Sequence, residues 1–130
     1  MLITVTVAAN TDRVADDAVV FETTSNQTHF LVTLRPEQGT MPIGTLHSWI
    51  LRVTDIDGYP LYPINLAIGG GMAAHRHGLP TQPQITDYLG DGEHRIEGVK
   101  FNMAGEWTLR VGIEHGGKRD IAEVRFDLDF

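Results

Sequence analysis

Residues 106–114 read Glu-Trp-Thr-Leu-Arg-Val-Gly-Ile-Glu and alternate apolar with polar or small residues at every step. Such a period of two predicts a strand with one buried face and one wet face. The turn His115–Lys118 follows, and residues 122–130 resume the alternation as Ala-Glu-Val-Arg-Phe-Asp-Leu-Asp-Phe. The two runs are therefore predicted to pair as a β-hairpin.

The same alternation recurs upstream and predicts strands at residues 3–7, 30–34, 45–54, 62–68 and 96–101. Turn sequences rich in glycine fall between these runs, where a positive φ is needed. The total of about seven strands predicts an all-β fold, an immunoglobulin-like antiparallel β-sandwich. Residues 13–20 are expected to be a loop or short helix, and residues 69–92 form the longest stretch without strand character. The predicted core consists of Trp49, Leu51, Leu66, Trp107, Leu109, Val111, Val124 and Phe126.

Length and composition restrict the possible classes of protein. The 130 residues fit a single domain, residues 1–130, of ordinary soluble composition. The net charge of -7 is the wrong sign for binding polyanions, so nucleic acid is not expected as a partner. The sequence has no cysteine, which removes disulfides, thiolate metal sites and a cysteine nucleophile. No apolar run approaches the length of a membrane span.

A loop rich in glycine and proline, residues 69–83, contains two histidines two positions apart, His75 and His77. In an extended backbone, residues i and i+2 point to the same side, so both imidazoles could face one ion. Two imidazoles alone hold a metal poorly, and the chain offers further donors in Met72, Met103 and His47. Thioether beside imidazole is typical of copper, whereas zinc more often takes thiolate or carboxylate beside histidine. The predicted cofactor is therefore a copper ion.

Each candidate ligand also has a purely structural interpretation. A His-x-His pair in a loop is most often two solvated imidazoles, and Gly69–Gly71 can simply turn the chain. His47 can be a satisfied histidine at the edge of the core, and Met103 can be core filler before a tight turn. The remaining histidines fall at strand edges or in a turn, where we expect exposure and no role: His29, His94 and His115.

Catalytic motifs are missing from the sequence. It contains neither a Gly-x-Ser-x-Gly nucleophile elbow nor a His-Glu-x-x-His zinc motif. The acidic run Asp55–Gly58 fits a hairpin-type turn, and an EF-hand would need several more oxygen ligands at fixed spacing. We therefore expect a binding protein and not an enzyme.

Four segments together resemble the YtkA-like and FixH-like group of bacterial extracytoplasmic domains, over residues 35–113. They are Pro42-Ile43-Gly44-x-x-His47-x-Trp49, Asp57-Gly58-x-Pro60, Gly70-Gly71-Met72-x-x-His75-x-His77-Gly78-Leu79-Pro80-Thr81-x-Pro83 and Glu97-Gly98-x-Lys100-Phe101-x-Met103-x-Gly105-x-Trp107. The Met-x-x-His-x-His segment is the most specific of them. Ala73 departs from the pattern, because similar sequences often carry proline there.

The resemblance implies an immunoglobulin-like sandwich that is exported or tethered to a membrane, with links to copper handling and respiratory oxidase assembly. The expected function is a non-catalytic, periplasmic or otherwise extracytoplasmic copper-binding module whose partner is a membrane or respiratory-chain protein. Residues 1–7 lack the features of a signal peptide, so we expect a signal or anchor upstream of residue 1. The alternative is a protein–protein interaction module without metal.

Overall fold

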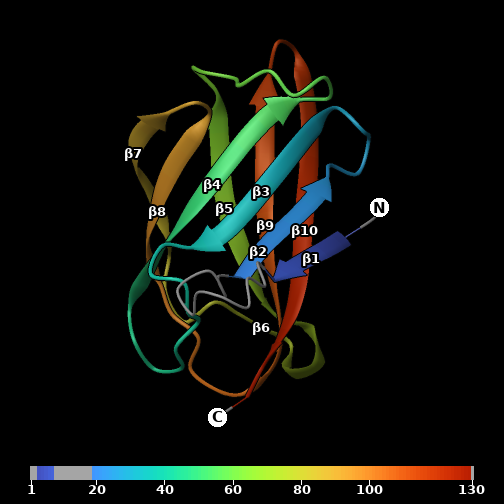
Figure 1. Cartoon of the computed structure of the whole chain (residues 1–130). Coiled ribbons are helices and arrows are strands. Elements are labelled where there is room, and N and C mark those ends of the chain that lie inside the picture. Colours follow the sequence, from blue (N-terminus) through green and yellow to red (C-terminus); the bar gives the residue numbers. More distant parts are fainter. Residues whose placement is uncertain (1–2, 8–18, 130) are drawn as a thin grey trace.

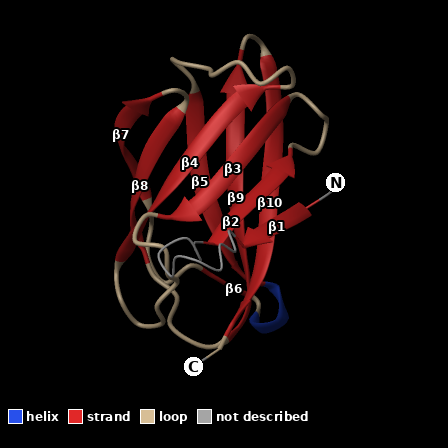
Figure 2. Ribbon diagram, in the orientation of Figure 1, coloured by secondary structure: helices blue, strands red, loops and turns tan. Residues whose placement is uncertain are grey.

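The alternating runs form two antiparallel sheets that pack face to face as a sandwich (Figure 1). The computed structural model describes residues 3–7 and 19–129. One sheet has six strands in the order β1-β2-β3-β4-β8-β7, and the other has four in the order β10-β9-β5-β6. The predicted all-β, immunoglobulin-like fold is confirmed (Figure 2).

Strands of the six-stranded sheet are β1 (Ile3–Val7), β2 (Val19–Thr24), β3 (Phe30–Pro36), β4 (His47–Asp55), β7 (Gln84–Gly90) and β8 (Glu93–Val99). Those of the four-stranded sheet are β5 (Asn65–Met72), β6 (His77–Gly78), β9 (Gly105–His115) and β10 (Lys118–Leu128). The predicted C-terminal hairpin is β9–β10, with Trp107 opposite Phe126 in its register. Within the described residues, no helix is long and apolar enough to cross a membrane.

Strands β2, β6 and β7 were not predicted, so the sandwich has more strands than the expected seven. Strand β7 lies within residues 69–92, for which no strand was predicted. It is an edge strand with mostly exposed residues and two register irregularities against β8. Such a strand has no buried face to impose alternation. Strand β2 overlaps the end of the predicted loop or short helix at residues 13–20, and residues 8–18 lie outside the described part of the chain.

The core lies between the sheets and contains the predicted residues. Seven of the eight are buried, and Leu66 is partly buried against the same cluster. Trp49 and Trp107 are fully buried at its centre, and the ring of Phe101 contacts both. Because the two strands that carry the tryptophans belong to different sheets, these aromatic contacts join the two layers.

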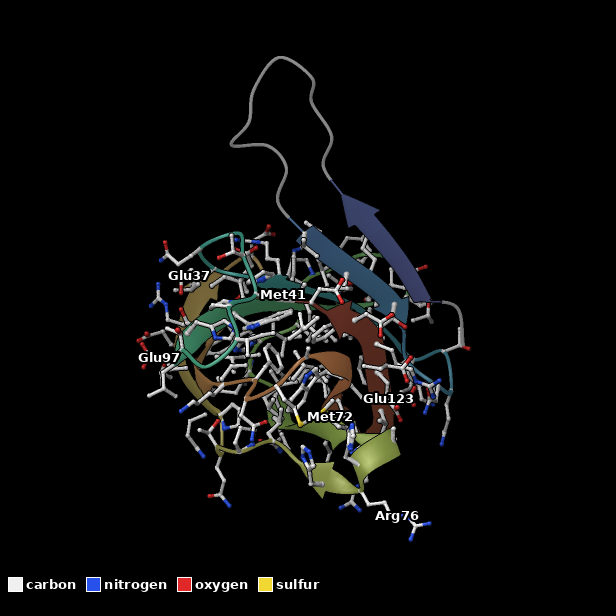
Figure 3. All side chains as sticks on the ribbon, turned by 90° about the horizontal axis from the view of Figure 1, so that it is seen from below. Glu37, Met41, Met72, Arg76, Glu97 and Glu123 are labelled. Carbon is white, nitrogen blue, oxygen red and sulfur yellow. The ribbon has the colours of Figure 1, made fainter. Side chains whose placement is uncertain are left out.

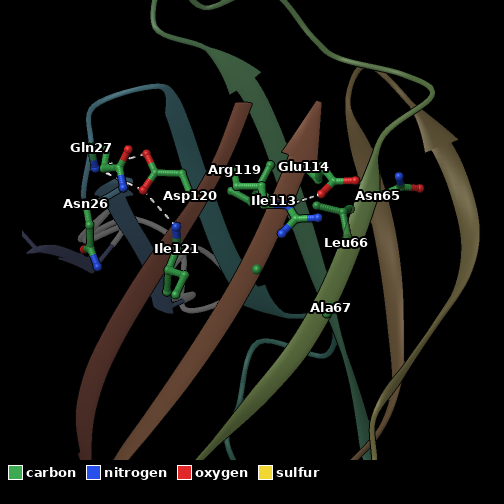
Figure 4. A pocket seen from close by; sticks show the side chains of 11 residues that line it. Asn26, Gln27, Asn65, Leu66, Ala67, Ile113, Glu114, Arg119, Asp120 and Ile121 are labelled. Atoms are coloured by element: carbon green, nitrogen blue, oxygen red, sulfur yellow. Dashed lines mark hydrogen bonds and ion pairs between the residues drawn. The ribbon is translucent and has the colours of Figure 1, made fainter. Parts of the chain in front are cut away.

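Asp120 fastens the β2–β3 turn to strand β10 at one end of the sandwich. Its carboxylate accepts hydrogen bonds from the backbone N–H groups of Gln27 and Ile121, at 3.0 and 2.8 Å, and from that of His29 at 3.3 Å. This carboxylate borders a hollow on the four-stranded sheet (Figure 4), and the volume of that hollow is about 510 Å³. Burial alone would raise the pKa of Asp120, but hydrogen bonds from Ser25 and the backbone outweigh it and lower that pKa.

Replacing Asp120 with asparagine is expected to lower the free energy of unfolding by about 1–3 kcal/mol, because an amide NH₂ group then faces backbone donors. The stabilisation by the carboxylate is complete above the pKa of an unfolded aspartate and is lost as the pH falls through the lowered folded value. Urea unfolding at neutral pH measures the loss. Asp127→Asn, an exposed position on the same strand, is the control. Equal stability of the two variants would contradict this role of Asp120.

Candidate metal-binding loop

The two loop histidines lie in a tight hairpin at the end of β5 (Figure 1). After Met72 the chain makes one 3-10 turn, Ala73–His75, and Arg76 then adopts the left-handed conformation with φ of 54°. Strand β6 returns along β5, with His77 paired to Met72 and Gly78 to Gly71. The backbone between the histidines is therefore bent and not extended as predicted.

Despite this bend, the imidazoles of His75 and His77 lie side by side. Their ring centroids are 6.0 Å apart, and the planes differ by 24°. Both residues are exposed, so an ion can reach them from solvent. The predicted juxtaposition of the two rings is present, although a left-handed residue between them produces it and not an extended strand.

Glycines in β5 allow the hairpin to close. Gly70 and Gly71 have φ of 148° and 150°, and a Cβ would lie 2.1 Å from the carbonyl oxygen of Thr108 or 2.2 Å from that of His77, respectively. Any side chain at either position would collide with backbone of a neighbouring strand. The glycine-rich run is thus part of a strand, where the sequence suggested a turn.

Of the two ring nitrogens of His77, Nε2 is the one available to a metal ion. Its Nδ1 lies 2.9 Å from the carbonyl oxygen of Gly78. Because a carbonyl oxygen only accepts, Nδ1 carries the proton and Nε2 holds the free lone pair. Metal-bound histidines commonly have their other nitrogen held in this way. The ring also contacts the edge of Trp107, with centroids 5.8 Å apart.

Met72 and Met103 belong to the core in this structure. Met72 is 1% exposed, and its terminal methyl lies 2.6 Å from the position that a Cβ on Gly105 would occupy. Figure 3 shows Met72 among the side chains inside the sandwich, while Arg76 extends outward. Met103 is partly buried against the core, and its carbonyl accepts a hydrogen bond from Trp107 Nε1 at 3.0 Å. Met72 is also the register partner of His77 across the β5–β6 pair.

His47 is engaged elsewhere. Its Nδ1 donates to the carbonyl of Thr45 at 2.9 Å, and its Nε2 accepts from Trp49 Nε1 at 3.0 Å. Burial lowers the pKa of His47, against a smaller opposing effect of the Thr45 hydrogen bond. A chain of ring contacts leads from His47 through Phe101 and Trp107 to His77. With both nitrogens occupied, His47 has no lone pair free for a metal in this arrangement.

The donor set that the structure brings together is thus a pair of exposed imidazoles, His75 and His77. Among the residues described, no group of three or more histidine, aspartate or glutamate side chains gathers where it could hold an ion. Two imidazoles fit a copper ion that keeps other positions open to solvent or to a second ligand. A buried thioether, Met72, lies at the end of the strand that carries the loop.

The expectation that His94 is exposed is wrong. His94 is 4% exposed, and its Nε2 is buried without a hydrogen-bond partner in the described part of the chain. The predicted strand began at residue 96, whereas β8 begins at Glu93 and places His94 on the same face as Ile96. Extending the alternation back by two residues from Ile96 would have revealed its burial.

Comparisons of the chain with protein-family models, with curated proteins and with solved structures find no match.

Proposed function

We propose that this protein is a non-catalytic copper-binding module in which His75 and His77 hold the ion. The observation that supports it most is the pairing of two exposed imidazoles, one of which has its Nδ1 proton held by a backbone carbonyl. That arrangement leaves Nε2 of His77 directed away from the backbone and ready to coordinate. The proposal includes an extracytoplasmic location and a membrane or respiratory-chain partner, which rest on the resemblance of the loop sequence.

Copper is favoured over zinc by the donors of this loop. Imidazole sites bind Cu(II) more tightly than other divalent first-row metals, and zinc sites usually include thiolate or carboxylate ligands. The cation Cu(I) gains more from thioether, but Met72 must leave the core to supply one. The loop as folded therefore suits Cu(II), and Cu(I) binding would be accompanied by movement of Met72.

A copper titration of the metal-free protein tests the proposal. Trp107 lies against the ring of His77, so Cu(II) bound there is expected to quench its fluorescence. We expect one Cu(II) per chain, bound more tightly than Zn(II) in the presence of a competing chelator. The Trp107→Phe variant identifies which tryptophan reports the binding. If the protein bound Cu(II) no more tightly than the competing chelator does, the proposal would be overturned.

Acidification is expected to release the copper, because protons compete with the metal for the imidazole lone pairs. The chelator titration repeated at descending pH measures this release. Circular dichroism over the same pH range is the control for general loss of structure. Copper affinity that does not change on acidification would show that the ligands are not imidazoles.

An interaction module is the second candidate, supported by an apolar tip at the other end of the sandwich. Five of the seven exposed large hydrophobic residues among those described lie in the β4–β5 connection and in β7: Ile56, Tyr59, Tyr62, Tyr88 and Leu89. Exposed apolar clusters of this kind often mark contact surfaces. Because the tip and the histidine loop lie at opposite ends of β5, separate variants can test the two functions.

A further inference from the structure

Three aromatic rings meet at the apolar end of the sandwich, and each comes from a different segment. Tyr62 lies in the β4–β5 connection, Tyr88 in β7 and His94 in β8. The two phenol rings stack with centroids 3.7 Å apart and planes 11° from parallel. The imidazole lies 5.0 Å from the ring of Tyr88 and 6.1 Å from that of Tyr62. Tyr62 is 59% exposed and His94 only 4%, so the imidazole is the buried member of this cluster.

The imidazole of His94 is suited to its position only while it is neutral. Its Nε2 is buried and lacks a hydrogen-bond partner among the described residues. Buried polar atoms in native proteins are nearly always paired, so this atom is an exception that needs a reason. Burial lowers the pKa of His94, because a charged ring there would lose its hydration without gaining a partner.

The titratable groups that face His94 are the phenols of Tyr62 and Tyr88, which are not carboxylates and offer no countercharge. Its register partner on β4 is Leu51. The charged neighbours on β8 alternate to the other face of the sheet: Glu93 pairs with Arg35, and Arg95 with Glu37 and Asp87.

The two tyrosines of the stack are held differently: Tyr88 has a hydrogen bond to the backbone, and Tyr62 is held by ring contacts. The hydroxyl of Tyr88 accepts a hydrogen bond from the backbone N–H of Gly92 at 3.0 Å, which ties its ring to the β7–β8 turn. Tyr62 belongs to the connection that crosses from one sheet to the other and is mostly exposed. Strand β7 is an edge strand whose pairing with β8 is irregular on both sides of Tyr88. This edge is therefore where local opening is least costly.

We propose that Tyr62, Tyr88 and His94 form a pH-sensitive clasp that joins the β4–β5 connection to the β7–β8 hairpin. A neutral imidazole keeps the clasp closed. Protonation places a cation without a countercharge beside the phenols, and its buried Nε2 reaches water when Tyr62 leaves Tyr88. Opening separates Tyr62 from the β7–β8 hairpin and exposes the faces of both phenols at the apolar tip.

The direction of the pH effect follows from proton linkage. The closed state binds fewer protons than the open state, so its stability is complete above the ordinary histidine pKa and declines as the pH falls towards the lowered value. Between these two pKa values, one titrating histidine changes the ratio of closed to open molecules by at most about tenfold per pH unit.

Amide hydrogen exchange of the metal-free protein, corrected for intrinsic rates and measured at about pH 7.5 and about pH 5, tests the clasp. Residues 56–64 and 84–92 are expected to lose protection at the lower pH by up to about tenfold per unit. The Tyr62→Ala variant is expected to be open at both pH values. Circular dichroism at each pH separates this local opening from global unfolding.

The decisive variant is His94→Gln, which is neutral and cannot titrate. It should show the same protection of both segments at the two pH values, and His94→Phe provides a second non-titrating variant in case glutamine is poorly tolerated. The matched control is His47→Gln, since His47 also has a pKa lowered by burial but lies at the opposite end of β4. A pH effect that persists in both His94 variants, or none in the parent, would overturn the clasp.

Discussion

Replacing both His75 and His77 with alanine is expected to abolish Cu(II) binding, with an affinity no greater than that of a control protein lacking the loop. The two imidazoles are the donors that the fold brings within 6.0 Å of each other, and no third histidine or carboxylate joins them among the described residues. A single remaining imidazole holds copper weakly, so each single variant should lose most of the affinity.

Two further variants show whether the loss is specific. The double variant His29→Ala/His115→Ala removes two histidines at the end of the sandwich opposite the His75–His77 loop. It should leave copper binding unchanged. Met72→Leu keeps the volume of a core side chain and should leave Cu(II) binding intact while weakening Cu(I) binding. If the double variant of the loop bound copper as tightly as the parent, the interaction module would become the preferred function.

Replacing Trp107 with alanine is expected to lower the free energy of unfolding by about 3–5 kcal/mol, the usual range for emptying a buried aromatic site. The residue is fully buried, packs against Phe101 and donates its indole N–H to the carbonyl of Met103. Such a loss is a large fraction of the stability of a typical domain. Denaturant unfolding followed by circular dichroism measures it.

Tyr59→Ala provides the matched control, because this aromatic residue is 69% exposed and its truncation should change stability little. Trp107→Phe retains much of the apolar volume and should fall between the two. Because Trp107 also supports the ring of His77, the alanine variant is expected to weaken copper binding as well. A melting temperature close to that of the parent would show that Trp107 is not central to the core.

Period-two alternation predicted most of the strands that have one buried and one wet face, but it missed β2, in which Phe21 and Thr23 are buried and Glu22 is exposed. In β9 and β10, every second residue meets the core, so hydrophobic burial imposes the pattern that the sequence displays. Strand β7 has no such constraint, because it lies at an edge and exposes most of its residues. Its pairing depends on backbone hydrogen bonds to β8, which leave little trace in side-chain identity.

The candidate site was predictable in part. The proximity of His75 and His77 follows from two positions of separation, since neighbouring side chains two residues apart cannot be far from each other. The conformation of Arg76 that aligns them was not predictable, because few residues other than glycine favour the left-handed region. The placement of Met103 and His47 was not predictable because they come from other strands, and the burial of Met72 depends on its packing against Gly105.

The sequence by itself determined the all-β class, most of the core and the pair of histidines, because each depends on local spacing along one strand or loop. Only the tertiary structure decided that His47 is bonded to Thr45 and Trp49, that Met72 fills the space above Gly105, and that His94 is buried beneath two phenols. The last two outcomes join segments far apart in the chain, whose contacts are set by sheet order and register. The partners of His47 are only two positions away, and there the orientation of the side chains in the folded strand decides the bonds.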